Sequence, residues 1–523
     1  MGVEYHSVII ESSLMEQISS NRTIAKNTFF LYGRMLFNLV VSLYTSRVIL
    51  QVLGVSDLGV YQVVAGIVAL FTFVNGSLAG ATSRFLAFEL GKSDIHRLSK
   101  TFVATLNVHI ITAGILFVVC ETIGLWFVNY KLNIPTGREF AANFVYQTSV
   151  LMTMLSLIQT PYNAAIIAHE RMKVFAYVGI LDTFLKLVAC YVLYITPFDR
   201  LVVYGLVLLL FTLIINLIYY IYCKHSFSEC HFRWSNDWSI SRPILIFSGW
   251  QLFGDFSLIT KNQGLNILLN LFYGVTLNAA CGFANTVYGA IAGFSNNFMI
   301  SIRPAITKAY SIEEYSRFND LINQASRFSF CLILLLTTPF IFDSNYILVL
   351  WLKTPPAYTD IFCQITLLTL IIAVLFSPVA YAINAAGKNK VISILHGPAL
   401  LLILPITYIV LKSGALPYLP FIITLIVEFF CFGSFPFLLK KIVPEFRLRY
   451  YYKKTILPCF LVALLVFLIV YIIHHFVFTD SAFLHLCILI TGTTITICFF
   501  SYFILLMENE RQMIKQKISY ILK

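Results

Sequence analysis

The sequence predicts an all-α polytopic membrane protein of about 14 transmembrane helices, and three observations support this fold class. The first is composition: of 523 residues, 59% are hydrophobic and only 11% are charged, whereas soluble domains contain about 45–50% apolar and 25% charged residues. The second is a series of long apolar stretches, and the third is an internal repeat. So little charge excludes a soluble enzyme, a disordered chain and a secreted disulfide scaffold.

Each apolar stretch is about as long as a helix that crosses the hydrocarbon of a bilayer, which needs about 20 residues. The stretch 244–272 is the most polar, because it carries Asp255 and Lys261. The segment 1–26 is polar and lacks a short apolar core, so we expect an uncleaved signal anchor in place of a cleavable signal peptide. The 14 predicted spans are 27–51, 58–82, 101–128, 140–168, 174–196, 201–222, 244–272, 276–300, 319–342, 360–384, 391–411, 416–439, 455–475 and 483–506.

Basic residues at the ends of these spans orient the chain, since cytoplasmic loops are enriched in Lys and Arg. Of the 36 Lys and Arg residues, 24 fall on the side of both termini, 5 on the opposite side and 7 inside spans. Both termini are therefore expected in the cytoplasm, and the net charge of +12 requires no nucleic-acid partner. The sequence Arg-Leu-Arg-Tyr-Tyr-Tyr-Lys-Lys at 447–454 is expected at the inner membrane surface, where its cations meet anionic lipid.

An internal repeat divides the chain into two similar halves. Residues 54–56 match 274–276 at an offset of 220, and 160–174 match 377–391 at an offset of 217, with six of fifteen residues identical. The alternative is chance similarity among apolar helices. Six spans per half give both halves the same orientation, which predicts two six-helix bundles related by a pseudo-twofold axis along the membrane normal, plus two C-terminal helices. The predicted domains are a cytoplasmic segment 1–26, bundles 27–222 and 244–439 with a linker 223–243, a basic segment 440–454, two helices in 455–506, and a cytoplasmic tail 507–523.

Two stretches carry a resemblance to a known family. Residues 27–64, with Leu-Gly-Val-Ser-Asp-Leu-Gly-Val-Tyr-Gln-Val at 53–63, and the Pro-x-x-x-Ala-x-x-Ala stretch at 161–168 resemble bacterial polysaccharide transporters of the O-antigen flippase type. That family belongs to the MATE-like multidrug/oligosaccharidyl-lipid/polysaccharide exporter superfamily, which also holds multidrug and toxin extrusion (MATE) exporters and the peptidoglycan-precursor flippase.

The resemblance implies a flippase of the bacterial inner membrane that moves an undecaprenyl-diphosphate-linked oligosaccharide by alternating access through a cationic central cavity. The cargo would be an O-antigen, capsule or exopolysaccharide repeat unit. The implied partners are this polyprenyl-diphosphate-linked oligosaccharide, the lipid bilayer, and the polysaccharide polymerase and chain-length machinery.

Charges inside the spans mark candidate functional residues, because a charge at the bilayer centre costs about 2.5–3.5 kcal/mol on insertion scales. Cations outnumber acids there, and an anionic diphosphate suits this excess because guanidinium groups bind phosphate oxygens in bidentate fashion. Arg84 and Arg303 occupy equivalent repeat positions near the cytoplasmic ends of their spans, where snorkelling to headgroups is the alternative. The candidate substrate-binding residues are Arg34, Arg84, Lys261, Arg303 and Arg327.

Four further residues are candidates for coupling or gating: Asp182, Lys186, Asp255 and Glu428. Asp182 and Lys186 are four residues apart on one helix and can pair, either structurally or as a pair that opens during transport. Arg34 and Asp255 occupy equivalent positions in the two halves and are expected to form, or alternate out of, an ion pair across the cavity. Asp255 and Glu428 are also candidates for proton or cation coupling.

The sequence contains no motif for catalysis, a cofactor or a metal. The 11 Cys include no C-x-x-C pair, the His residues lack metal-ligand spacing, and there is no P-loop. A membrane enzyme such as a polymerase or ligase would need a large external loop, and the sequence has none. The main alternative function is a MATE-type exporter driven by sodium ions or protons, although cationic drugs would favour a cavity with excess carboxylate.

Overall fold

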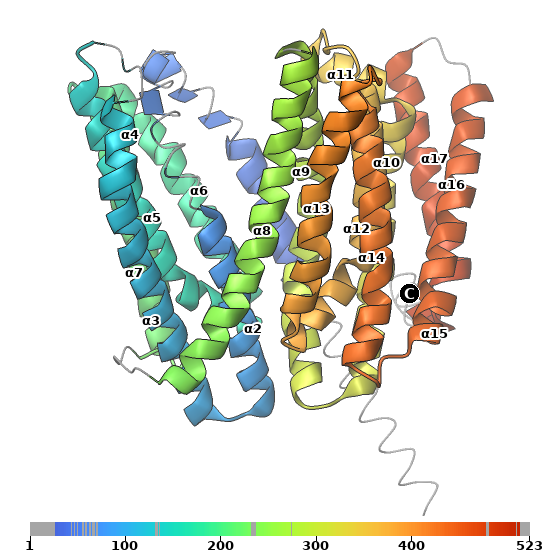
Figure 1. The fold of residues 1–523 in the computed structure, drawn as a ribbon, viewed down its shortest axis with the longest axis horizontal. Coiled ribbons are helices and arrows are strands. Elements are labelled where there is room, and N and C mark those ends of the chain that lie inside the picture. The colour runs from blue at the N-terminus through green and yellow to red at the C-terminus, as the bar shows by residue number, and fades with distance from the viewer. Residues whose placement is uncertain are drawn as a thin grey trace, which may run out of the picture. The chain divides into compact units, whose positions relative to one another are not determined.

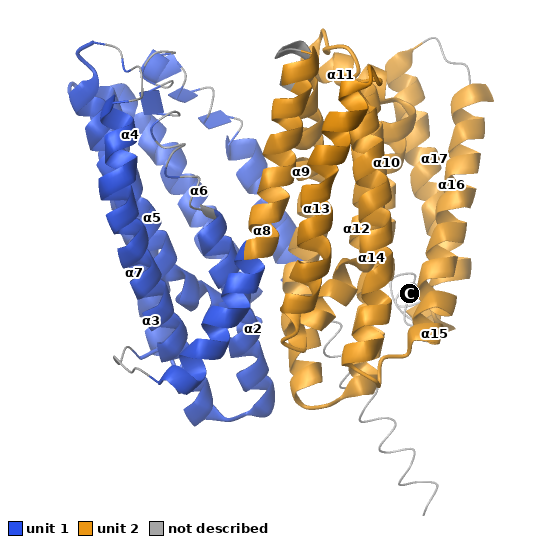
Figure 2. Ribbon diagram, in the orientation of Figure 1, with its two compact units in different colours: residues 1–252 blue, residues 253–523 orange. Residues whose placement is uncertain are grey.

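The computed structural model describes residues 27–42, 44–45, 48–49, 51–54, 57, 60–61, 64, 68, 72–130, 134, 136–231, 237–273, 275–476, 481–508 and 510–512. All regular elements within these residues are helices. The chain divides into two compact units, unit 1 with residues 1–252 and unit 2 with residues 253–523 (Figure 2). Because the boundary falls within one long helix, α8 (Trp238–Tyr273), that helix begins in unit 1 and ends in unit 2.

Unit 1 is a helical bundle built around one central helix (Figure 1). Residues 27–42 are helical and precede the labelled elements. The central helix α5 packs against α2, α3 and α7, and its Tyr146 and Leu157 are fully buried. The elements that follow residues 27–42 are α2 (Thr72–Lys92), α3 (Ile95–Val119), a π-helical turn η1 (Cys120–Gly124), α4 (Leu125–Tyr130), α5 (Glu139–Ala168), α6 (Met172–Ile195), α7 (Arg200–Ser226) and the start of α8.

Unit 2 repeats this arrangement and adds a C-terminal extension. Its central helix α12 packs against α9, α10 and α14, while α16 and α17 pack against each other and against α10. The elements after α8 are α9 (Val275–Ser311), α10 (Tyr315–Phe342), α11 (Ser344–Leu352), α12 (Thr359–Ala385), α13 (Asn389–Lys412), α14 (Leu419–Ile442), α15 (Leu448–Tyr451), a π-helical turn η2 (Tyr452–Ile456), α16 (Leu457–Phe476), α17 (Ala482–Phe500) and a π-helical turn η3 (Ser501–Leu505).

The backbone carries the predicted repeat at the predicted offsets. The helices α3 and α10 begin 220 residues apart, as do α5 and α12, whereas α6 and α13 begin 217 residues apart. Left-handed residues recur in the corners between these helices: Ser93 and Glu313 have φ of 57° and 61°, and Glu170 and Gly387 have φ of 58° and 73°. Few non-glycine residues adopt such φ values, so their recurrence at both offsets argues against chance similarity.

The fold class predicted from the sequence is confirmed: the chain is an all-α polytopic membrane protein. Ten helical segments among the described residues are long and apolar enough to cross a membrane. The predicted spans 244–272 and 276–300 are α8 and α9, which are helices of 36 and 37 residues. The predicted spans 27–51 and 58–82 lie partly outside the described residues.

The structure corrects several details of the predicted spans. Helices α2 and α9 continue 10 and 11 residues past the predicted ends at 82 and 300, because charged residues such as Arg84 and Arg303 end the apolar stretch without ending the helix. The helix α11 lies in a segment predicted to be a loop, and the π-helical turns were not predicted.

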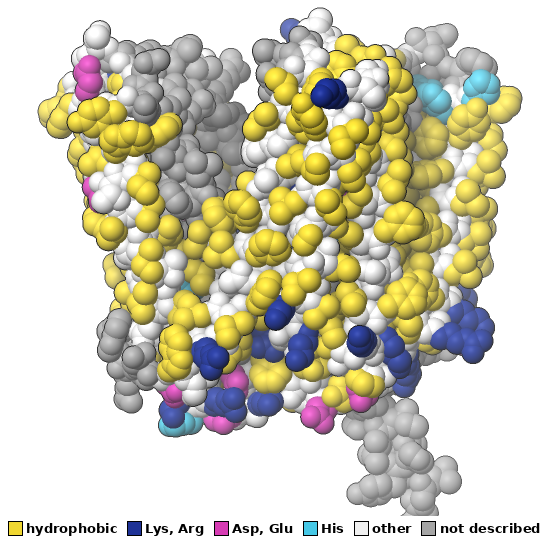
Figure 3. All heavy atoms as spheres, in the orientation of Figure 1, with side chains coloured by type: hydrophobic (Ala, Val, Ile, Leu, Met, Phe, Trp, Pro, Cys, Tyr) yellow, Lys and Arg dark blue, Asp and Glu magenta, His cyan; other side chains and the backbone are white. Residues whose placement is uncertain are grey.

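The surface of unit 2 has the distribution expected of a membrane protein. Hydrophobic side chains cover the length of its helices, and basic side chains gather at the end where α15 lies (Figure 3). This basic end contains the sequence 440–454, which has six Lys and Arg residues. The cytoplasmic orientation of this end stays a prediction from the positive-inside rule.

Candidate functional site

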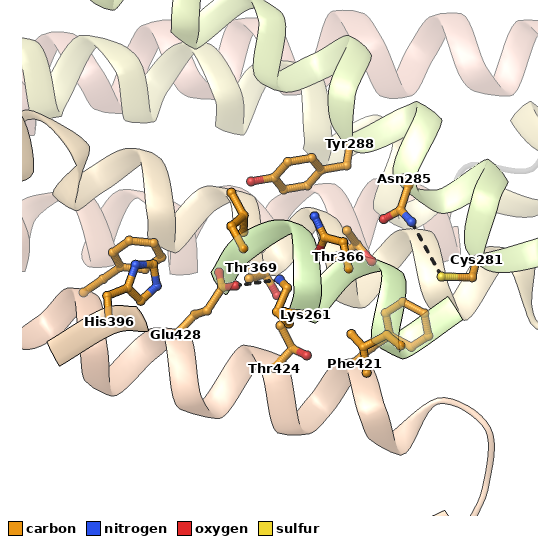
Figure 4. A pocket seen from close by; sticks show the side chains of 14 residues that line it. Lys261, Cys281, Asn285, Tyr288, Thr366, Thr369, His396, Phe421, Thr424 and Glu428 are labelled. Atoms are coloured by element: carbon orange, nitrogen blue, oxygen red, sulfur yellow. Dashed lines mark hydrogen bonds and ion pairs between the residues drawn. The ribbon is translucent and has the colours of Figure 1, made fainter. Parts of the chain in front are cut away.

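A cavity inside unit 2 contains a buried ion pair. The Nζ atom of Lys261 on α8 lies 3.0 Å from Oε1 of Glu428 on α14, and only 9% and 8% of the two side chains are exposed. The cavity has a volume of about 220 Å³, and Figure 4 shows both charged groups facing it. It is bounded by α8, α9, α12, α13 and α14, and its other polar lining residues are Asn262, Asn285, Tyr288, Thr366, Thr369, His396 and Thr424.

The hydroxyl groups around this ion pair present oxygen atoms that can accept hydrogen bonds. Thr366, Thr369 and Thr424 each donate to the backbone carbonyl four residues earlier, at 2.6, 3.0 and 2.8 Å. Their remaining lone pairs are available as acceptors. The amide nitrogen of Asn285 points to Sγ of Cys281 at 3.6 Å, so its carbonyl oxygen is a further acceptor. The cavity can therefore hold polar groups that donate hydrogen bonds.

His396 closes one side of the cavity between aromatic rings. Its ring lies 5.1 Å from that of Phe432 and 6.0 Å from that of Phe435. Figure 4 shows it beside Glu428. The sequence offered no metal-ligand spacing for this histidine, and its place in the cavity follows only from the packing of α13 against α14.

Arg84 and Arg303 share an environment as well as a repeat position. Each lies eight residues before the last residue of its helix, α2 or α9. The Cζ of Arg303 is 3.7 Å from the ring centroid of Tyr381, whose hydroxyl also accepts a hydrogen bond from Arg303. The Cζ of Arg84 is 4.5 Å from the centroid of Phe85 and 5.7 Å from that of Phe247. Both guanidinium groups are thus held on aromatic rings, an arrangement that preserves their charge.

Arg34 is held in the same way within unit 1. Its Cζ lies 4.1 Å from the ring centroid of Phe175 on α6. One turn further along α6, Gly179 leaves room for the Arg34 side chain, since a Cβ at this glycine would lie 2.6 Å from Cδ of Arg34. A side chain at this position would therefore displace the Arg34 side chain. The predicted partner of Arg34 is Asp255, which belongs to unit 2. The ion pair between Arg34 and Asp255 therefore stays a prediction.

Three other predicted charges form two ion pairs outside the cavity. Arg327 on α10 donates to Oε1 of Glu510 at 2.8 Å, and both side chains are buried. Asp182 and Lys186 form the predicted contact, with 2.7 Å between Oδ2 and Nζ, on an exposed face of α6. Of the nine predicted site residues, the structure places two in one cavity, Lys261 and Glu428.

An ion-pair cluster in unit 1 was missed by the sequence analysis. The guanidinium of Arg138, just before α5, donates to Asp57 at 2.8 Å through Nε and also pairs with Asp199. The hydrogen bond with Asp57 raises the pKa of Arg138 further above its usual value. None of these three residues was singled out in the sequence analysis, because they lie far apart along the chain.

These features define a class: a polytopic helical membrane protein with two bundles and charged groups inside its apolar helices. Its fold is that of MATE and MOP superfamily transporters. A MOP superfamily transporter from Pyrococcus furiosus matches with a TM-score of 0.66 over 83% of this chain and 97% of that chain, at 14% identity. The MATE transporter VcmN of Vibrio cholerae, as a variant, matches with a TM-score of 0.64 over 83% of this chain and 100% of that chain, at 16% identity.

A multidrug resistance MATE family transporter in an outward-facing conformation also has this fold, with a TM-score of 0.65 over 81% of this chain and 96% of that chain, at 14% identity. No protein-family model and no curated protein matches the sequence. At these identities, the likeness establishes the fold. The substrate has to be argued from the residues of this chain.

Proposed function

We propose that this chain exports an anionic lipid-linked oligosaccharide across the bacterial inner membrane by alternating access. The observation that carries the proposal is the equivalent placement of Arg84 and Arg303 on aromatic rings. A guanidinium held over a ring keeps its charge, and its several N–H donors match the oxygens of a phosphate. Arg303 uses one of these donors on the hydroxyl of Tyr381. A polyprenyl diphosphate carries such oxygens.

The transporter fold supports export, and the residues favour an anion as cargo. The carboxylate of Glu428 in the cavity of unit 2 is already matched by a cation, since Lys261 pairs with it. A cationic drug would have to displace that lysine. The Pyrococcus furiosus transporter is described as having a binding pocket of reverse polarity that suggests a different function, which supports the idea that pocket polarity varies within this fold.

The alternative is a cation-coupled exporter of small molecules, and one observation favours it. Glu428 is a buried carboxylate in a cavity lined by hydroxyl oxygens, which could accept a proton or a small cation if Lys261 moved away. The two functions differ in what accumulates when the protein is absent.

The test is depletion of the protein in cells that encode it, followed by lipid extraction and mass spectrometry of polyprenyl-diphosphate species. We expect one discrete lipid-linked oligosaccharide to accumulate and to disappear when the wild type is restored. Arg303→Gln should clear it at least about tenfold more slowly, because a charge-assisted hydrogen bond is worth about 1.5–3 kcal/mol. Arg303→Lys should retain partial activity.

The matched control is Arg317→Gln, at the exposed start of α10, where the arginine pairs with Glu314. This variant should clear the intermediate at the wild-type rate. Normal lipid intermediates in depleted cells, together with raised sensitivity to cationic dyes, would contradict the proposal and favour the exporter of small molecules.

A further inference from the structure

The cavity of unit 2 presents both donors and acceptors of hydrogen bonds. The ammonium group of Lys261 has three N–H groups and uses one on Oε1 of Glu428, so two donors and the second carboxylate oxygen remain. Thr366 and Thr369 donate to the backbone and keep their acceptor lone pairs. A metal ion is bound by acceptors and a phosphate by donors. A mixed lining instead matches hydroxyl groups, because each of them both donates and accepts.

The charges of this lining cancel. Of the described residues that line the cavity, only Lys261 and Glu428 are of the types Lys, Arg, Asp or Glu, and they pair with each other. An anion in the cavity would be repelled by the carboxylate, and a cation would be repelled by the ammonium group. The cavity therefore favours an uncharged ligand.

The size and walls of the cavity suit a single ring. Its volume of about 220 Å³ is below the roughly 300–1,000 Å³ of pockets that hold drug-sized ligands. Tyr288, Phe421 and Phe432 contribute aromatic walls, and ligand pockets combine such walls with a few polar groups. Asn262 on α8 and Asn285 on α9 are exposed, so a ligand can enter past these two amides.

We propose that this cavity binds one uncharged sugar ring of the transported oligosaccharide, an inference that rests on the proposed function. Hydroxyl groups of the ring donate to the hydroxyls of Thr366 and Thr369 and to the carboxylate, and they accept from the ammonium group. The apolar C–H faces of the ring pack against the aromatic walls. Figure 4 shows these threonines around the ion pair, with Tyr288 beside them. The cavity thus recognises the glycan and takes no part in holding the diphosphate.

The experiment uses the glycan without its lipid. Mild acid releases the oligosaccharide from the lipid-linked intermediate that accumulates in depleted cells, and isothermal titration calorimetry measures its binding to the purified full-length chain in choline chloride. The wild type should bind the released glycan. Thr366→Val/Thr369→Val should weaken this binding at least about fivefold, because each neutral hydrogen bond contributes at least about twofold. Arg303→Gln, which slows transport, should bind the phosphate-free glycan within about twofold of the wild type.

The matched control is Thr337→Val/Thr338→Val on α10. These two threonines are buried and also donate to carbonyls four residues earlier, at 2.8 and 2.6 Å, but they do not line the cavity. This control should bind the glycan as the wild type does. If Thr366 and Thr369 were only structural, both double variants would change the melting temperature alike and neither would change glycan binding.

The outcomes separate this inference from the proposed function. Accumulation of the intermediate, with equal glycan binding by the wild type and Thr366→Val/Thr369→Val or with no glycan binding at all, would overturn the inference alone. Displacement of the glycan by sodium chloride in place of choline chloride would also overturn it, because the cavity would then be a cation site. The absence of any lipid-linked intermediate in depleted cells would contradict the proposed function, and the inference would fall with it.

Discussion

At the scale of single residues, the pairing of Lys261 with Glu428 lowers the cost of burying two charges in an apolar bundle. Each charge alone would be costly inside an apolar bundle, whereas a hydrogen-bonded pair offsets part of that cost. The sequence identified both residues as candidates because each is an isolated charge in an apolar span. It did not identify them as partners, since 167 residues separate them and nothing in the periodicity of α8 and α14 determines which faces meet.

Removing one partner of this pair should be far more damaging than removing both. We expect Lys261→Met to lower the free energy of unfolding by about 3–5 kcal/mol, because it leaves the carboxylate of Glu428 buried and unpaired. The double variant Lys261→Met/Glu428→Leu should recover most of that loss. Thermal unfolding in one detergent measures both, and equal stability of the single variant and the wild type would contradict this account.

Gly179 provides a test of how Arg34 is positioned. We expect Gly179→Ala to displace the Arg34 side chain from Phe175, because the new Cβ would meet Cδ of Arg34 at 2.6 Å. Transport should fall while the melting temperature changes little, since the side chain can move. The control is Gly114→Ala on α3, where no atom lies within 4 Å of the added Cβ. Unchanged transport by Gly179→Ala would show that transport does not depend on the position of the Arg34 side chain.

At the scale of elements, α10 has a polar face that matches the C-terminal extension. Asn319, Asn323, Ser326 and Arg327 lie on one side of this helix, and all four bond to residues of the segment 445–510. At an offset of 220, unit 1 has Ser99, Val103, Leu106 and Asn107 on α3. The two central positions are apolar in the unit that lacks an extension, which indicates that this face of α10 is specialised for docking.

Two glutamates near the end of the described chain test this docking. Glu510 is buried against Arg327, and its second oxygen accepts from the backbone N–H of Met507 at 2.8 Å. Glu510→Ala should destabilise unit 2 by about 3–5 kcal/mol, because it leaves the guanidinium buried and unpaired. Glu508→Ala, an exposed neighbour, should change stability by less than about 0.5 kcal/mol. Hydrogen exchange of α17 measures the effect, and similar exchange in both variants would contradict it.

Helix boundaries were predicted well where the length of an apolar stretch alone determines them. The boundaries of α5, α6 and α12 fall within two residues of the predicted spans 140–168, 174–196 and 360–384. Hydropathy could not predict the π-helical turns, since a widened turn depends on side-chain packing, as where the hydroxyl of Tyr146 reaches the backbone oxygen of Cys120 at 2.6 Å. The spacing on α6 predicted the ion pair of Asp182 with Lys186, whereas the pairs of Lys261 with Glu428 and of Arg327 with Glu510 were out of reach because they join segments distant in sequence.

The whole molecule is organised by the distribution of its basic residues and by its repeat. Both features were read from the sequence, and the backbone carries the repeat at the same offsets. The orientation predicts that reporters at the two faces behave differently. Green fluorescent protein fused after Lys523 should fluoresce, and alkaline phosphatase inserted after Lys353 should be active, because each reporter works on only one side of the inner membrane.

Alkaline phosphatase inserted after Lys388 is the control for this topology. It should be inactive, because that corner belongs to the basic side of the chain. Activity at Lys388 together with inactivity at Lys353 would reverse the orientation. The basic segment 440–454 would then face the periplasm.

The left-handed corners have a consequence for how the chain enters the membrane. Only two or three residues join α2 to α3, α5 to α6, α9 to α10 and α12 to α13. Helices joined by so few residues reach the insertion machinery almost together and can enter the bilayer as hairpins. The apolar residues of both helices then offset the cost of a charge in one of them, such as Arg84, which an isolated helix would bear alone. Lengthening such a corner would separate the two insertion events and leave the arginine-bearing helix to partition by itself.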